Sequence, residues 1–74
     1  MSMPGQKIKQ DSSIQIGANI RAIRKEKKVG QTELVRQLQL MGVDMTRETL
    51  VKIERGMQHV QASQLRGIRD ALLK

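Results

Sequence analysis

The chain contains no phenylalanine, tyrosine, tryptophan or cysteine anywhere in its 74 residues. Its core must therefore be built from isoleucine, leucine, valine, methionine and alanine. The lack of cysteine also removes disulfides, thiolate chemistry and cysteine-based zinc sites, and it suits a reducing compartment. A domain of this length buries only about 60% of the surface that its unfolded chain exposes, so we expect one domain of modest stability.

Apolar residues recur with the period of an α-helix, and no stretch of useful length alternates as a strand would. Ile16, Ile20 and Ile23, for example, fall on one stripe of a helix. The expected fold class is therefore all-α. The pattern predicts four short helices, over about residues 14–28, 31–41, 46–55 and 62–73. The residues expected to face inward on the last three are Leu34, Val35, Leu38, Met41, Leu50, Ile53, Leu65, Ile68 and Leu72.

Capping residues mark the ends of the predicted helices. Gly30 and Thr46 are expected to be the N-caps of the second and third helices. Gly42 and Gly56 are expected to end the same two helices, because glycine readily adopts the left-handed conformation that follows a last turn. Gly17 lies inside the first helix, where it would allow another helix to approach closely.

Residues 1–13, with the sequence MSMPGQKIKQDSS, have the composition of a tail. They combine proline, glycine and two lysines with little apolar content, so we expect them to be disordered. The alternative is a basic arm that contacts phosphates. Residues 14–74 form the predicted domain. We see no signal peptide and no apolar run near the roughly 20 residues of a membrane span, so we expect no membrane association.

The charge of the chain indicates the class of partner. Fourteen lysines and arginines face seven aspartates and glutamates, which gives a formal net charge of +7 and a pI near 10.6. A polyanion is the natural partner for such a chain, and nucleic acid is the favoured one. A membrane surface, an acidic protein, or no polyanion at all are the alternatives that charge alone leaves open.

Catalytic signals are weak. The one histidine, His59, lies in a predicted loop without an acid and a nucleophile that would form a relay with it. The glycines stand singly, so no phosphate-binding loop is present. We therefore expect no enzyme activity, no cofactor, no metal site and no small-molecule effector. The carboxylates that lack metal-ligand spacing are Glu26, Glu33, Glu48 and Glu54.

The second and third predicted helices match a helix-turn-helix, in which the second helix of the pair lies in the major groove. With Leu50 and Ile53 facing the core, the outward residues of the leading turns are Arg47, Glu48, Thr49 and Lys52. Arginine can bond guanine with two N–H groups, glutamate can accept from cytosine N4, and threonine can bond a base or touch a thymine methyl. Lysine one turn further on can reach a base or a phosphate. The alternative is a packing helix with four solvated polar residues.

The run IGANIRAIRKEKKVGQTELVRQL, followed by MTRETLVKIERG, resembles the Cro and phage-repressor class of helix-turn-helix regulators, often called the XRE family. The resemblance covers about residues 14–72. It rests on an ordered set of features: IRAIRKEKK in the first helix, GQTEL opening the second, TRETLVKIERG for the third, and an apolar fourth helix. It implies a compact, lambda-repressor-like bundle of four or five helices that binds operator DNA as a dimer and represses transcription.

The resemblance also implies roles for individual residues. Gln31 corresponds to a glutamine at the start of the second helix that contacts a phosphate, and helix N-termini favour anions. Arg55 and Gly56 correspond to residues that meet phosphate after the third helix. Arg24 and Glu54 correspond to an ion pair between the first helix and the end of the third. The base-reading positions correspond to Arg47, Glu48 and Lys52, with Thr49 near a base or the backbone.

The chain departs from the family pattern in two places. Seven residues, Gln39–Met45, separate the last core leucine of the second helix from Thr46, where family members have a shorter connection. We therefore expect a longer second helix and a wider connection. Gly30 stands where the family usually has serine or threonine, which is a slightly weaker cap.

The expected function is sequence-specific DNA binding in transcriptional repression, in the cytoplasm and associated with the nucleoid. The expected partner is double-stranded DNA, bound by a homodimer, because one recognition helix covers only a half-site. Gln31, Arg36 and Arg55 are the expected phosphate contacts. The alternative is a protein-interaction or antitoxin-like module that uses the same bundle. Candidate dimer surfaces are the 62–73 helix, the Gly42–Met45 connection, and the apolar residues Met57, Val60 and Leu73.

Overall fold

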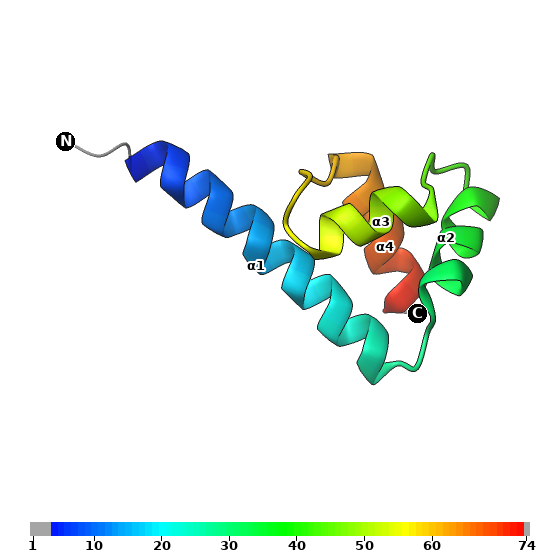
Figure 1. Ribbon diagram of the computed structural model, residues 1–74. Helices are drawn as coiled ribbons and strands as arrows, with labels where there is room; N and C mark the ends of the chain where they lie inside the picture. The colour runs from blue at the N-terminus through cyan, green and yellow to red at the C-terminus, as the bar shows by residue number, and fades with distance from the viewer. Residues whose placement is uncertain (1–3, 74) are drawn as a thin grey trace.

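Four α-helices make up the regular structure of residues 4–73, the part of the chain that this computed structural model describes (Figure 1). In chain order they are α1 (Pro4–Glu26), α2 (Gln31–Leu40), α3 (Arg47–Glu54) and α4 (Ala62–Leu72). No strand occurs among these residues, so the predicted all-α fold class is confirmed. Within the same part of the chain, no helix has both the length and the apolar character needed to cross a membrane.

The first helix begins at Pro4, ten residues before the predicted start. Proline fits the first turn of a helix, because its fixed φ is suitable and its missing N–H would have had no helical partner. No second proline follows to interrupt the helix. Residues 4–13, which we expected to form a disordered tail, therefore continue α1, and its N-terminal half extends away from the other helices (Figure 1). Residues 1–3 of that predicted tail lie outside the described residues.

The helices α2 and α3 end in the same motif, in which a residue of positive φ follows the last turn and two backbone hydrogen bonds close the end. After α2, the amide of Gly42 donates to the carbonyl of Gln39 at 3.0 Å, and the amide of Val43 donates to the carbonyl of Leu38 at 2.9 Å. Equivalent bonds follow α3 at Gly56. The φ values of 83° at Gly42 and 73° at Gly56 confirm both predicted stops.

The first helix ends in this motif without a glycine. Lys28 holds the position of positive φ, at 58°. Its amide donates to the carbonyl of Lys25, and the amide of Val29 donates to the carbonyl of Arg24, both at 3.0 Å. The predicted end near residue 28 is therefore corrected to Glu26. The periodic pattern could not show this, because lysine gives no sign of a left-handed turn.

Side-chain and backbone caps begin the remaining helices. The hydroxyl oxygen of Thr46 accepts a hydrogen bond from the amide of Thr49 at 3.1 Å, which confirms Thr46 as the N-cap of α3. Gly30 is the N-cap of α2, as predicted, and contributes no side-chain bond. At the start of α4, the side-chain oxygen of Gln64 accepts from the amide of Gln61 at 2.9 Å.

An aliphatic core lies where the four helices meet. The helix α1 packs against α3 and α4, and α2 packs against the same two helices. The inward residues predicted for α2 and α3 are confirmed except for Met41, which follows α2 and is 40% exposed. On α4, Leu65 is only half-buried at the edge of the core, while Gln64 is buried. The buried apolar residues are Ile20, Leu34, Val35, Leu38, Met45, Leu50, Ile53, Ile68 and Leu72.

Two glycines allow α1 to lie directly against the C-terminal end of α3. A β-carbon at Gly17 would collide with the carbonyl oxygen of Ile53 and would lie 2.9 Å from that of Glu54. A β-carbon at Gly56 would lie 2.9 Å from the α-carbon of Ile14. Both neighbours are backbone atoms, so side-chain movement cannot relieve either contact. The close approach predicted for Gly17 is therefore confirmed, and it places the end of α3 on α1.

The connection between α2 and α3, residues 41–46, is held at several points. Met45 is buried in the core, with 2% of its surface exposed. The side-chain amide of Gln39 donates to the carbonyl of Met45 at 3.0 Å, and that of Gln64 donates to the carbonyl of Asp44 at 3.2 Å. The connection therefore fixes where α3 begins.

Candidate nucleic-acid interface

The helix α3 has one buried side and one exposed side. Leu50, Ile53 and Glu54 are buried against the other helices. Arg47, Glu48 and Lys52 are exposed, so three of the four predicted base-contact residues share the outer side of the first two turns. Because the inner side is packed and the N-terminus is capped, the chain presents these three charged side chains from a fixed helix.

The charges on this outer side follow the rows of the helix surface. Glu48 and Lys52 are four residues apart and so lie on one row. In the described part of the chain, the ion pair that forms is between Arg24 and Glu54, so Lys52 does not neutralise Glu48 there. Arg47 begins a neighbouring row that passes through Val51 to Arg55, four residues at a time. Positive charge therefore lies at both ends of α3.

Thr49 differs from the other predicted base contacts. It is half-buried, and its hydroxyl takes part in the N-cap of α3. The hydroxyl of Thr46 donates to the hydroxyl oxygen of Thr49 at 2.9 Å, and it accepts from the backbone amide of Thr49. The hydroxyl hydrogen of Thr49 is left to donate elsewhere. Thr49 could therefore donate to a base while its hydroxyl oxygen still accepts the bond from Thr46.

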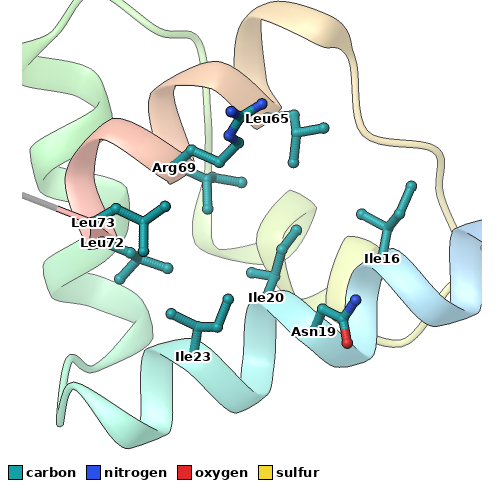
Figure 2. A pocket seen from close by; sticks show the side chains of 9 residues that line it. Ile16, Asn19, Ile20, Ile23, Leu65, Arg69, Leu72 and Leu73 are labelled. Atoms are coloured by element: carbon teal, nitrogen blue, oxygen red, sulfur yellow. The ribbon is translucent and has the colours of Figure 1, made fainter.

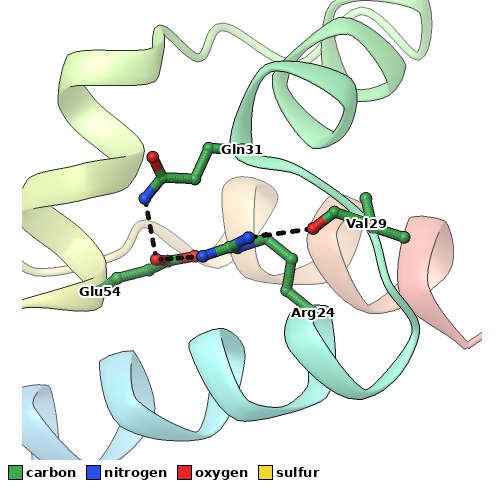
Figure 3. A network of polar contacts seen from close by, with 4 residues as sticks. All are labelled: Arg24, Val29, Gln31 and Glu54. Carbon is green, nitrogen blue, oxygen red and sulfur yellow. Dashed lines mark hydrogen bonds and ion pairs between the residues drawn. The ribbon is translucent and has the colours of Figure 1, made fainter.

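The two predicted phosphate contacts on α2 have different surroundings. Gln31 begins the helix and is half-buried, and its side-chain nitrogen donates to Glu54 Oε1 at 3.1 Å. Its side-chain oxygen points away from that bond (Figure 3). Arg36 lies on the outer side of α2 and is exposed. The bond to Glu54 therefore holds the Gln31 side chain in one orientation, whereas the Arg36 side chain extends into solvent.

The ion pair expected between Arg24 and Glu54 is present, and it joins three segments of the chain (Figure 3). Arg24 Nε donates to Glu54 Oε2 at 2.8 Å, and Arg24 Nη2 donates to Glu54 Oε1 at 3.1 Å. Arg24 Nη1 donates to the carbonyl of Val29 at 2.9 Å. The pair is buried, with 10% and 3% of the two side chains exposed. It therefore fixes the end of α3 relative to α1 and to the turn that leads into α2.

Arg21 was missed as a site residue, because neither the helix-turn-helix pattern nor the family resemblance assigns a role to it. It lines a polar hollow together with Gln31, Val51, Glu54 and Arg55. The signal that locates it is its spacing from Arg24, since residues three apart share a helix face. Once Arg24 is paired with Glu54, Arg21 must lie beside the same end of α3.

An apolar groove separates α1 from α4 on another side of the molecule. Figure 2 shows Ile16, Ile20 and Ile23 of α1 facing Leu65 and Leu72 of α4 across it. Its volume is about 210 Å³. Among the residues predicted to form a dimer surface, Leu73 lines this groove and is 60% exposed, and Met57 is 69% exposed. Val60 instead packs against the core.

Possible metal ligands are dispersed over the described part of the chain. Among the described residues, no three histidine, aspartate or glutamate side chains lie close enough together to hold a metal ion. The ring nitrogen Nδ1 of His59 is within hydrogen-bond distance of the Ser13 hydroxyl. This contact joins the loop after α3 to α1.

Comparison of the chain with protein-family models, with curated proteins and with solved structures finds no significant match. The resemblance of residues 14–72 to the Cro and phage-repressor class therefore stays a prediction.

Proposed function

We propose that this protein is a sequence-specific DNA-binding regulator of transcription that places the first two turns of α3 in the major groove. The observation that carries the proposal is the outer side of α3: Arg47, Glu48 and Lys52 are exposed together beyond the Thr46 cap, while the inner side is packed and ion-paired. A helix that is held this firmly can present donors and acceptors to base edges in one register. The net charge of +7 favours a polyanionic partner.

The exposed side chains divide into two roles. Arg47 offers two parallel N–H groups to guanine, and Glu48 accepts from cytosine N4. Glu48 is unfavourable near phosphates unless it makes such a contact, so it also discriminates against other bases. Gln31, Arg36 and Arg55 bind the backbone, and Lys52 reaches a base or a phosphate. Thr49 adds a hydroxyl donor or a methyl contact at the edge of the groove.

A homodimer is the proposed binding unit, because the leading turns of one α3 cover only a half-site. Two copies on an inverted repeat would bind tightly enough to exclude other proteins from the same DNA, and so would repress transcription. This activity would take place in the cytoplasm, on the nucleoid.

Selection of bound sequences from a random duplex library tests the proposal. We expect enrichment of an inverted repeat whose half-sites are centred about one helical turn, roughly 10 base pairs, apart. A guanine is expected in each half-site at the position that Arg47 reaches. A library that shows no enrichment over the unselected pool would contradict sequence-specific recognition.

A protein-interaction module is the second candidate function, and the exposed apolar surface favours it. The groove between α1 and α4 is lined mainly by isoleucine and leucine, and Leu40 at the end of α2 is 81% exposed. Fluorescence anisotropy with a mixed-sequence duplex at low salt separates the two functions. If no duplex is bound under these conditions, the interaction module becomes the better reading.

A further inference from the structure

A polar hollow of about 550 Å³ lies where the C-terminal part of α1, the start of α2 and the end of α3 meet. Arg21 comes from α1, Gln31 from α2, and Val51 and Arg55 from α3 and its C-cap. Both arginines are exposed, so their guanidinium groups can reach a ligand that enters from solvent.

The hollow carries excess positive charge despite the glutamate in its wall. Both carboxylate oxygens of Glu54 already accept hydrogen bonds, from Arg24 and from Gln31. Arg24 therefore neutralises this carboxylate. Among the side chains described, residues 12–73, neither Arg21 nor Arg55 takes part in an ion pair. Two unneutralised guanidinium groups thus line one hollow, and this arrangement attracts an anion.

The chemistry of the hollow fits a phosphate diester. A guanidinium group presents planar pairs of N–H donors that match two oxygens of a phosphate, and arginine is favoured for such contacts over lysine. The row of α3 that begins at Arg47 leads through Val51 to Arg55, so the hollow adjoins the side of α3 proposed to enter the groove. A backbone phosphate beside that groove is therefore the anion within reach.

We propose that Arg21 and Arg55 together hold one backbone phosphate of bound DNA in this hollow. The proposal rests on the proposed function, and it adds a contact from α1 that neither the sequence pattern nor the helix-turn-helix resemblance assigns. The same end of α3 that Arg24 and Glu54 fix relative to α1 would then be fixed relative to the DNA backbone. A contact of this kind sets the register of the helix without reading sequence.

Replacement of Arg21 by glutamine tests the proposal, with Arg66→Gln as the matched control. Both variants lose one positive charge. Arg66 is an exposed residue of α4 that does not line the hollow, so its replacement changes the charge alone. Binding to a mixed-sequence duplex and to a selected duplex is measured by fluorescence anisotropy over a range of salt concentrations. For Arg21→Gln we expect a similar loss of affinity for both duplexes, with little change in the salt slope, because Arg55 still neutralises the shared phosphate. Arg66→Gln should keep both the affinity and the slope of the natural protein.

Arg21→Lys provides the second variant. It keeps the charge but not the planar donor pair, so we expect an intermediate affinity with the salt slope retained. Circular dichroism melting curves check that each variant is folded. If the natural protein binds duplex and Arg21→Gln behaves like Arg66→Gln, the phosphate contact is overturned while the proposed function stands. If the natural protein binds no duplex at low salt, the proposed function is overturned as well.

Discussion

The carboxylate of Glu54 is almost fully buried, and Arg24 compensates its negative charge. Removing one partner of a buried ion pair leaves the other charge without compensation, which destabilises a protein by about 3–5 kcal/mol. We therefore expect Arg24→Met to lower the free energy of unfolding by about that amount, measured by urea denaturation followed by circular dichroism. Lys25→Met is the control, because Lys25 is the exposed neighbour and its loss should change stability little.

The double variant Arg24→Met/Glu54→Leu separates the ion pair from general packing. With both charges removed, no unpaired charge stays buried, and we expect most of the lost stability to return. If Arg24→Met is no less stable than Lys25→Met, the pair does not hold α3 in place.

Arg47 is the exposed residue from which we expect the most sequence discrimination. Replacing it by alanine should reduce binding to a selected duplex by about 1–3 kcal/mol and relax the preference at one base pair. Binding to a mixed-sequence duplex should weaken much less, since only a general charge is lost there. Competition binding with both duplexes measures the difference, and Arg66→Ala serves as the charge-matched control. Equal weakening of the two duplexes by Arg47→Ala would contradict a base-reading role.

At the level of single elements, the turn after α1 is the least favourable helix end. A non-glycine residue in the left-handed region is disfavoured by about 1–2 kcal/mol. Glycine at this position would avoid that cost, but it lowers the free energy of unfolding by about 0.4–1 kcal/mol because it raises the entropy of the unfolded chain. We therefore expect Lys28→Gly to stabilise the fold by about 0.5–1 kcal/mol, seen as a higher melting temperature.

Lys27→Gly is the matched control for that change, since it removes the same charge one residue earlier, where φ is not positive. It adds the flexibility of glycine without relieving any strain, so we expect no stabilisation. A melting temperature that rises equally in both variants would indicate that charge, and not backbone conformation, is responsible.

The helix ends show which parts of the fold the sequence could predict. Thr46, Gly42 and Gly56 were predicted correctly, because a cap or a left-handed turn requires particular residue types. The start of α1 at Pro4 was missed, because residues 4–13 offer almost no apolar periodicity. The end of α1 was misplaced for a different reason: Lys28 adopts a conformation that its residue type does not favour.

The candidate site could be predicted from the sequence where it depends on one helix, but not where it depends on several. Arg47, Glu48 and Lys52 follow from the spacing of Leu50 and Ile53 within α3. Two further residues act between elements. Arg21 reaches the end of α3 from α1, and Gln64 of α4 bonds the connection before α3. Such contacts arise from tertiary packing, which local patterns do not contain.

At the scale of the whole molecule, the salt dependence of binding reports how many protomers contact DNA. Each protomer contributes four cationic side chains to the proposed backbone contacts: Arg21, Arg36, Lys52 and Arg55. Because Arg21 and Arg55 share one phosphate, each protomer neutralises three phosphates, and log K falls with log salt with a slope of about −2.7 for one protomer and about −5.4 for two. Between 50 and 200 mM salt, affinity should then fall by a factor of roughly 40 for a monomer and roughly 2,000 for a dimer.

We expect the dimer value on a selected inverted repeat and the monomer value on a duplex that carries one half-site. Fluorescence anisotropy titrations at four or more salt concentrations give both slopes. The half-site duplex is the internal control, because it offers the same contacts to one protomer only. If both duplexes give the slope of one protomer, the proposed binding by a dimer is wrong. Protomers would then bind the two half-sites independently. A steeper slope on the full site ties the symmetry of the operator to a pair of α3 helices.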